Sequence, residues 1–75
     1  MKILFFAHLR EQIGASIELE CAECTIRQLM EKVVEKFPDV DFSTVMVAVN
    51  EEFATSDTLV QSTDVVALIP PVSGG

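Results

Sequence analysis

Residues 25–38 read TIRQLMEKVVEKFP, and the apolar positions in this stretch have helical spacing. They recur at i, i+3, i+4, i+7, i+8 and i+11, which places them on one face of an α-helix. These positions are Ile26, Leu29, Met30, Val33, Val34 and Phe37. Thr25 and Gln28 have the spacing of a capping box, in which a hydroxyl and an amide satisfy free backbone groups at the helix start. Pro38 ends the segment, so the sequence predicts one amphipathic helix here.

Two strands are predicted before this helix. Residues 2–7, KILFFA, form a near-continuous apolar run that indicates a central strand. Residues 16–21, SIELEC, alternate between polar and apolar positions, which is typical of a half-buried strand. The inward side chains of this second strand would be Ile17, Leu19 and Cys21. A short loop containing Gly14 joins the two runs, so we expect an antiparallel hairpin.

The chain after the helix returns to strand-like patterns. In order, it predicts a strand at 45–49, a turn at 50–52, a short return strand at 53–54, a mostly polar segment at 55–64 and a last strand at 65–69. Leu59 and Val60 would anchor the polar segment by packing. Pro70 and Pro71 end the last strand because proline cannot donate to a strand ladder.

The order of these elements predicts an α+β fold. One main helix can cover one face of a mixed sheet of four to five strands. Residues 1–69 would form this single domain, and residues 70–75, PPVSGG, would form a flexible tail outside the core. Two terminal glycines make a slender tip that could enter a narrow channel in another protein. A loose or trimmed end without function is the alternative interpretation of the tail.

Size and charge exclude several classes of function. A chain of 75 residues has a thin core and too little enclosed volume for a deep substrate cavity, which favours a carrier or binding module. A net charge of −7 disfavours binding to nucleic acid or to an anionic membrane. No apolar run approaches the roughly 18 residues that span a bilayer, and the start lacks a signal-peptide cleavage site, so we expect a cytoplasmic protein.

Cys21 and Cys24 have C-x-x-C spacing. A zinc site needs four ligands, and His8 is the only histidine that could add a third soft donor. A redox motif of this spacing belongs to a thioredoxin-like βαβ unit, for which the chain is too short. We therefore predict neither a metal site nor a redox function, with Cys21 as a small core residue at a strand end and Cys24 before the helix cap.

Several segments together resemble a known family. They are residues 2–7 (KILFFA), Arg10-Glu11, residues 47–50 (VAVN), residues 64–66 and residues 69–75 (IPPVSGG). This combination resembles the small subunit of molybdopterin synthase (MoaD type), one of the β-grasp, ubiquitin-like sulfur carriers. The terminal PPVSGG is its most specific part. The carrier of the thiamine pathway (ThiS type) shares the fold and the Gly-Gly but usually lacks the Pro-Pro.

The resemblance implies a function for the terminus. In such carriers an activating enzyme related to the ubiquitin-activating family uses ATP and magnesium to adenylate the last glycine. A sulfur donor then replaces AMP and leaves a thiocarboxylate, whose sulfur is delivered inside a large catalytic subunit to build the dithiolene of molybdopterin. Gly75, with Gly74, would be the reactive end of this chain. The chain itself would bind no cofactor, supply no acid–base residue and work as part of a hetero-oligomer.

Three other functions remain open at this point. The chain could carry sulfur to another product, such as thiamine thiazole, a thiolated tRNA base or a tungsten pterin. It could be a ubiquitin-like tag joined through Gly75 to lysines of target proteins. It could also be a plain β-grasp interaction domain with a tail that has no function.

Strand alternation predicts the face that a partner would bind. Lys2, Leu4, Phe6 and His8 share one side of the first strand, and the charged pair marks that side as the outer one. In a ubiquitin-like sheet the matching outer positions would be Met46, Ala48, Ala67 and Ile69. The predicted partner-binding residues are therefore Leu4, Phe6, Met46 and Ile69, with Arg10 at the rim and Pro70, Pro71 and Val72 leading away. The opposite parity, with these residues in the core, is the alternative.

Overall fold

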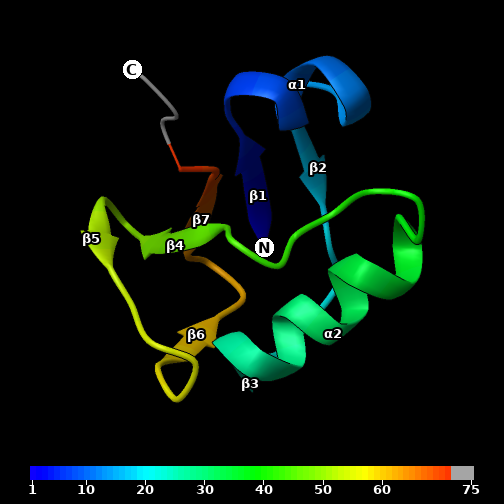
Figure 1. Cartoon of the computed structure of the whole chain (residues 1–75). Helices are drawn as coiled ribbons and strands as arrows, with labels where there is room; N and C mark the ends of the chain where they lie inside the picture. The colour runs from blue at the N-terminus through cyan, green and yellow to red at the C-terminus, as the bar shows by residue number, and fades with distance from the viewer. Residues whose placement is uncertain (72–75) are drawn as a thin grey trace.

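The computed structural model describes residues 1–71, so Val72, Ser73 and the glycine pair Gly74-Gly75 lie outside the described residues. The elements in chain order are β1 (Lys2–Phe5), α1 (Ala7–Ile13), β2 (Ser16–Glu18), β3 (Glu23–Thr25), α2 (Ile26–Lys36), β4 (Met46–Val49), β5 (Glu52–Phe53), β6 (Leu59–Gln61) and β7 (Val65–Ile69) (Figure 1).

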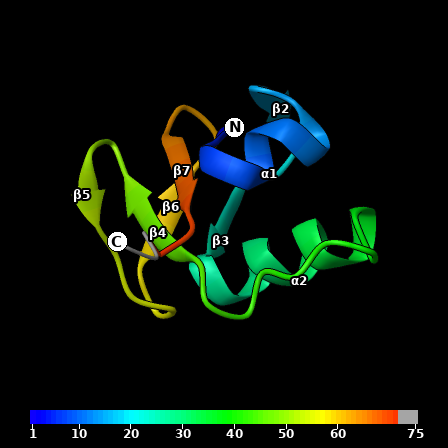
Figure 2. The ribbon, with the colours of Figure 1, turned by 45° about the horizontal axis from the view of Figure 1, so that its top comes forward.

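A five-stranded sheet of order β2-β1-β7-β4-β5 forms the body of the protein. β1 and β7 pair in parallel, and every other pair in this sheet is antiparallel. Helix α2 lies across one face of the sheet, as Figures 1 and 2 show from two directions. The structure thus confirms the predicted α+β fold, a mixed five-stranded sheet with one main helix in the β-grasp arrangement.

Helix α2 begins at the predicted capping box. The Gln28 backbone N–H donates to Thr25 Oγ1 at 3.2 Å, and the Thr25 N–H donates to Gln28 Oε1 at 3.0 Å. The next two free N–H groups, of Ile26 and Arg27, donate to carbonyls of the loop 56–58. All four groups would otherwise lack partners at the helix start, so the cap fixes both the start of α2 and its contact with this loop.

The core lies between α2 and the sheet. Ile26, Leu29 and Val33 of α2 are buried as predicted, whereas Val34, predicted on the same face, is exposed. Burying a side chain of this size completely contributes about 1.5–3 kcal/mol. Facing the helix are the inward residues of the two parallel strands, Ile3, Phe5, Val66 and Leu68, all at most 2% exposed. The strand parity predicted for β1 is therefore correct over residues 2–5.

The prediction of a strand through Ala7 is wrong, because β1 ends at Phe5 and a seven-residue helix, α1, follows. Leu9 is fully buried and Ile13 is half-buried one turn later, so an apolar pair at i and i+4 holds this helix on the sheet. The helix ends at Gly14, whose φ of +128° suits glycine and whose N–H donates to the Arg10 carbonyl at 2.9 Å.

Two further differences concern short strands. β2 ends at Glu18, so Cys21 is a half-buried residue of the following connection rather than the end of a strand. β3 and β6 form a second, two-stranded sheet that was not predicted. Of the predicted anchor pair, Val60 is fully buried in β6 and Leu59 is exposed.

The last described residues differ in burial. Pro70 is buried and Pro71 is exposed, so burial continues one residue past the predicted end of the domain at Ile69 and includes the first residue of the predicted tail. Neither helix in the described part of the chain is long and apolar enough to cross a membrane.

The β4–β5 hairpin turns through Asn50 and Glu51, which both have positive φ, +50° and +73°. This is the geometry of a type I′ turn, whose second position favours glycine. Glu51→Gly should therefore raise the free energy of unfolding by about 0.5–1 kcal/mol, because a left-handed conformation is costly for residues with a Cβ. Urea unfolding measures the change. Glu31→Gly, at an exposed position in the middle of α2, is the control and should lower stability by about 1 kcal/mol; equal effects of the two variants would contradict the turn assignment.

Candidate functional site

A row of four side chains crosses the face of the sheet opposite α2. Leu4 pairs with Ala67, Ala67 with Ala48, and Ala48 with Phe53, so one side chain from each of β1, β7, β4 and β5 stands in register. The two central members are alanines and the two outer ones are large. Small residues flanked by large residues leave a depression in the middle of a sheet face.

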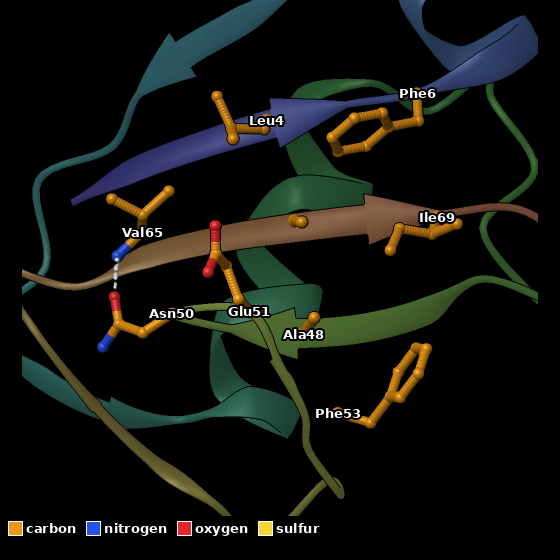
Figure 3. Close-up of a pocket in the computed structure, with 9 residues that line it drawn as sticks. Leu4, Phe6, Ala48, Asn50, Glu51, Phe53, Val65 and Ile69 are labelled. Carbon is orange, nitrogen blue, oxygen red and sulfur yellow. Dashed lines mark hydrogen bonds between the residues drawn. The ribbon is translucent and has the colours of Figure 1, made fainter.

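The depression is an open hollow of about 560 Å³. Its described lining residues are Leu4, Phe6, Ala48, Asn50, Glu51, Phe53, Val65, Ala67 and Ile69. Figure 3 shows their side chains on the near face of the sheet, with α2 behind it. Phe6 and Phe53 are 41% and 74% exposed, so two aromatic rings border the hollow in contact with solvent. Exposed apolar surface of this kind is characteristic of a protein interface.

The hollow lies beside the place where the chain leaves the sheet. β1 and β7 are parallel, so the ends of both strands point the same way, and Phe6 and Ile69 stand together at that end (Figure 3). Ile69 is followed directly by the buried Pro70 and the exposed Pro71. A partner that covers Phe6 and Ile69 would therefore also meet the first described residues of the predicted tail.

The opposite end of the hollow is polar and fixed by Asn50. Its side-chain Oδ1 accepts from the Val65 N–H at 3.0 Å, and its backbone N–H donates to the Val65 carbonyl at 2.8 Å. Its Nδ2 donates to Asp64 Oδ1 at 3.0 Å. These bonds hold the β4–β5 turn against the start of β7. Of the lining residues described, only Glu51 is charged, and it lies on this same turn.

Asp64 joins the turn to the preceding loop. Its Oδ2 accepts from the Gln61 N–H at 2.8 Å while Oδ1 accepts from Asn50. The bond from the Gln61 backbone, followed by that from Asn50, holds the pKa of the Asp64 carboxyl below its usual value. Hydrogen bonds to the ionised form favour that form.

The structure separates the predicted partner-binding and terminal residues into four groups. Leu4, Phe6 and Ile69 line the hollow, together with the predicted outer residues Ala48 and Ala67. Met46 pairs with Ile69 and is exposed, but it lines a neighbouring depression instead. Arg10, Pro70 and Pro71 do not line the hollow, and Arg10 is exposed on α1. Val72, Gly74 and Gly75 lie outside the described residues.

The polar end of the hollow and the position of Phe53 on its border were not predicted from the sequence. Asn50 and Glu51 belong to the predicted turn at 50–52, but no local pattern indicates that the Asn50 side chain bonds to Val65 on a neighbouring strand. Phe53 follows the turn by two positions, and hairpin pairing with Ala48 could have placed it on the outer face.

The described lining of the hollow has the chemistry of a binding surface. Its described lining offers apolar surface, one amide and one carboxylate, without a histidine, cysteine, serine or lysine. Within residues 1–71 no group of three or more His, Cys, Asp or Glu side chains could hold a metal ion. The described surface can therefore accept an apolar side chain of another molecule.

Comparison with known families gives a match to the ThiS family over residues 3–75. The chain belongs to the ThiS family. The match covers the sheet and both helices and continues to Gly75, so it includes the terminal Gly-Gly.

Two curated relatives resemble the ThiS-family chain over nearly its whole length. It is 38% identical over 79 residues to the molybdopterin synthase sulfur carrier subunit of Arabidopsis thaliana, covering 100% of this chain and 82% of that protein. It is 37% identical over 81 residues to the protein of the same description from Dictyostelium discoideum, covering 99% and 94%. The resemblance inferred from the sequence is thus confirmed.

Two solved structures show the same fold. SAMP1, a small archaeal modifier protein of Haloferax volcanii, superimposes with a TM-score of 0.74 at 25% identity, covering 99% of this chain and 97% of that chain. A chain from the complex of subunits 1 and 2 of molybdopterin-converting factor from Helicobacter pylori gives 0.74 at 22% identity, covering 99% and 96%. At 22% identity, the likeness to the Helicobacter pylori chain shows the fold alone.

The lowered pKa of Asp64 predicts a pH-dependent stability. A carboxyl whose pKa is lower in the folded than in the unfolded chain stabilises the fold above its unfolded pKa, and this contribution is lost as the pH falls through the folded pKa. Asp64→Asn should therefore lower the free energy of unfolding near neutral pH and have less effect in acid. Urea unfolding at a series of pH values measures the difference. Asp41, whose pKa is lowered by hydrogen bonds from Ser43, contributes the same pH dependence to the wild type and to the Asp64→Asn variant, so it cancels in the comparison. If the unfolding free energies of the wild type and the variant differ by the same amount at every pH, this role of Asp64 is contradicted.

Proposed function

We propose that this protein is the sulfur carrier subunit of a molybdopterin synthase. The observation that carries the proposal is the full-length similarity, at 37–38% identity, to two molybdopterin synthase sulfur carrier subunits within a family match that runs through Gly75. The site supports it in a second way. A carrier needs a surface for its partners, and the exposed apolar lining of the hollow offers one.

The reactive end in this proposal is the Gly75 carboxylate. An activating enzyme joins it to AMP from ATP with release of pyrophosphate, and the mixed anhydride is then open to attack at its carbonyl carbon. A sulfur nucleophile displaces AMP, and one carboxylate oxygen is thereby replaced by sulfur. ATP, magnesium and the acid–base groups belong to the activating enzyme. Gly74 leaves the tip free of side chains, so that it can enter a narrow channel.

The hollow in this proposal receives the large catalytic subunit of the synthase. In the Helicobacter pylori assembly, subunits 1 and 2 of molybdopterin-converting factor form a complex. An apolar side chain of the large subunit would fill the space above Ala48 and Ala67, between Leu4 and Phe53. Contact with Phe6 and Ile69 at the same time would direct residues 70–75 into that partner's active site.

A second candidate function is protein modification. It is favoured by the likeness to SAMP1, which is named as a modifier protein and shares the fold over 97% of its length. In that case the activated Gly75 carbonyl would be attacked by a lysine amine of a target protein instead of by sulfur. The two functions share the activation step and differ in the nucleophile that follows it.

Loading the chain with sulfur tests the first candidate. The chain is incubated with an activating enzyme related to the ubiquitin-activating family, ATP, magnesium and a sulfur donor. The intact mass of the chain should then increase by the difference in mass between a sulfur and an oxygen atom. Deleting Gly75 should abolish this increase. The double variant Cys21→Ala/Cys24→Ala is the control and should load normally, because the sulfur is held at the terminus. Addition of a whole sulfur atom that depends on the cysteines would contradict the proposal, and a ladder of protein conjugates would favour the modifier.

Filling the hollow tests the docking surface. Ala67→Leu adds a large side chain at the centre of the hollow, on the face away from the core, and should weaken binding to the large subunit at least tenfold without unfolding the protein. Ala22→Leu makes the same change at an exposed position outside the hollow and should bind normally. Titration calorimetry measures both. Equal affinities of the two variants would show that the partner does not use this hollow.

A further inference from the structure

Cys21 and Cys24 lie in a second depression, on another part of the surface. Its described lining residues are Cys21, Ala22, Glu23, Cys24, Gln28, Glu31, Lys32 and Glu35, from β3, the segment before it and helix α2. It shares none of these with the hollow on the sheet. A function of the two cysteines would therefore be separate from the proposed sulfur carrier function.

The two sulfur atoms are already in contact. Cys21 Sγ lies 2.8 Å from Cys24 Sγ in a thiol–thiol hydrogen bond, and both residues are free cysteines. A disulfide bond is about 2.05 Å long, so the sulfurs need to approach by less than about 1 Å to form one. Cys24 is held in place by β3, where it pairs with Val60 of β6, while Cys21 belongs to the connection before β3. Cys21 can therefore move toward Cys24.

The two thiols also differ in access. Cys24 is 5% exposed, whereas Cys21 is half-buried and open to the depression. An accessible thiol beside a buried one is the arrangement in which the first attacks an incoming disulfide and the second completes the exchange.

We propose that Cys21 and Cys24 are a dithiol site that exchanges with small-molecule disulfides and closes to an intramolecular disulfide. The Cys21 thiolate attacks one sulfur of the incoming disulfide, whose S–S bond breaks as a mixed disulfide forms and one thiolate leaves. Cys24 then gives up its proton and attacks the Cys21 sulfur, and the second small thiol leaves. The two cysteines lose two electrons and two protons in total, and the small disulfide gains them.

The electrostatics of the site agree with this order of attack. Burial, followed by the hydrogen bond and the charge of Cys21, raises the pKa of Cys24 to about 11, against a smaller opposing effect of Lys32. Cys24 is therefore a poor first nucleophile near neutral pH. Once Cys21 is in a mixed disulfide its thiolate charge is gone, so one of the causes that hold the proton on Cys24 is removed at the step in which Cys24 must react.

The charges of the depression select the class of disulfide. Glu23, Glu31 and Glu35 line it with a single cation, Lys32, and the whole chain carries a net charge of −7. An anionic disulfide, such as glutathione disulfide, is repelled by this surface. A cationic disulfide, such as cystamine, is attracted. The site therefore favours cationic over anionic disulfides.

The reaction of the full-length chain with cystamine tests the site. The wild type should lose the mass of two hydrogens and become resistant to alkylation at both cysteines. Cys24→Ser should stop at a mixed disulfide on Cys21, and Cys21→Ser should react at least tenfold more slowly because its remaining thiol is buried. Wild-type protein that accumulates mixed disulfide, or disulfide-linked dimers, would overturn the proposal.

A redox titration of the wild type tests the same claim without any variant. Contact between the sulfurs in the folded chain should favour the disulfide about tenfold more in buffer than in urea, which is about 30 mV for a two-electron couple. Equal potentials would show that the fold does not bring the two thiols together. Cystamine should also oxidise the protein faster than glutathione disulfide does at low salt; the reverse order would refute the assigned class of disulfide.

Discussion

The parallel pairing of β1 with β7 is the constraint on which the rest of the structure depends. It places the first and last strands side by side at the centre of the sheet and fixes which residues face α2. In register, Ile3 and Phe5 lie inward beside Val66 and Leu68, and the residues between them lie outward. A slip of one residue would exchange the two faces, so the core and the hollow are determined together.

The same pairing fits the proposed carrier function. Because the two strands run in parallel and end at the same end of the sheet, the exposed ring of Phe6 and the half-buried side chain of Ile69 stand next to the residue where the chain leaves the sheet. The centre of the outer face is hollow because β7 and β4 place Ala67 and Ala48 opposite each other. The hollow thus lies beside Pro70, the first residue of the predicted tail, and the proposed chemistry can be supplied by partners that hold both.

The sequence predicts those parts of the fold that local patterns determine. Helix α2 follows from its apolar spacing and capping box, and Lys2 reveals the outer face of β1. Helix α1 was missed because Phe6 provides no side-chain cap and the helix is only seven residues long. β3 and β6 were missed because three-residue strands from distant segments gain their identity from tertiary pairing. The polar end of the hollow likewise depends on bonds from Asn50 to β7 that no local pattern reveals.

Hydrogen exchange of the full-length chain, alone and with the large synthase subunit, tests the central claim most directly. If the partner binds the outer face of the sheet, backbone amides around Phe6, in the Asn50–Phe53 hairpin and from Ala67 to Ile69 should gain protection. Amides of the exposed side of α2 and of the segment around Cys21 should exchange as before. Protection confined to α2 and the cysteine segment, with the hairpin unchanged, would contradict the account.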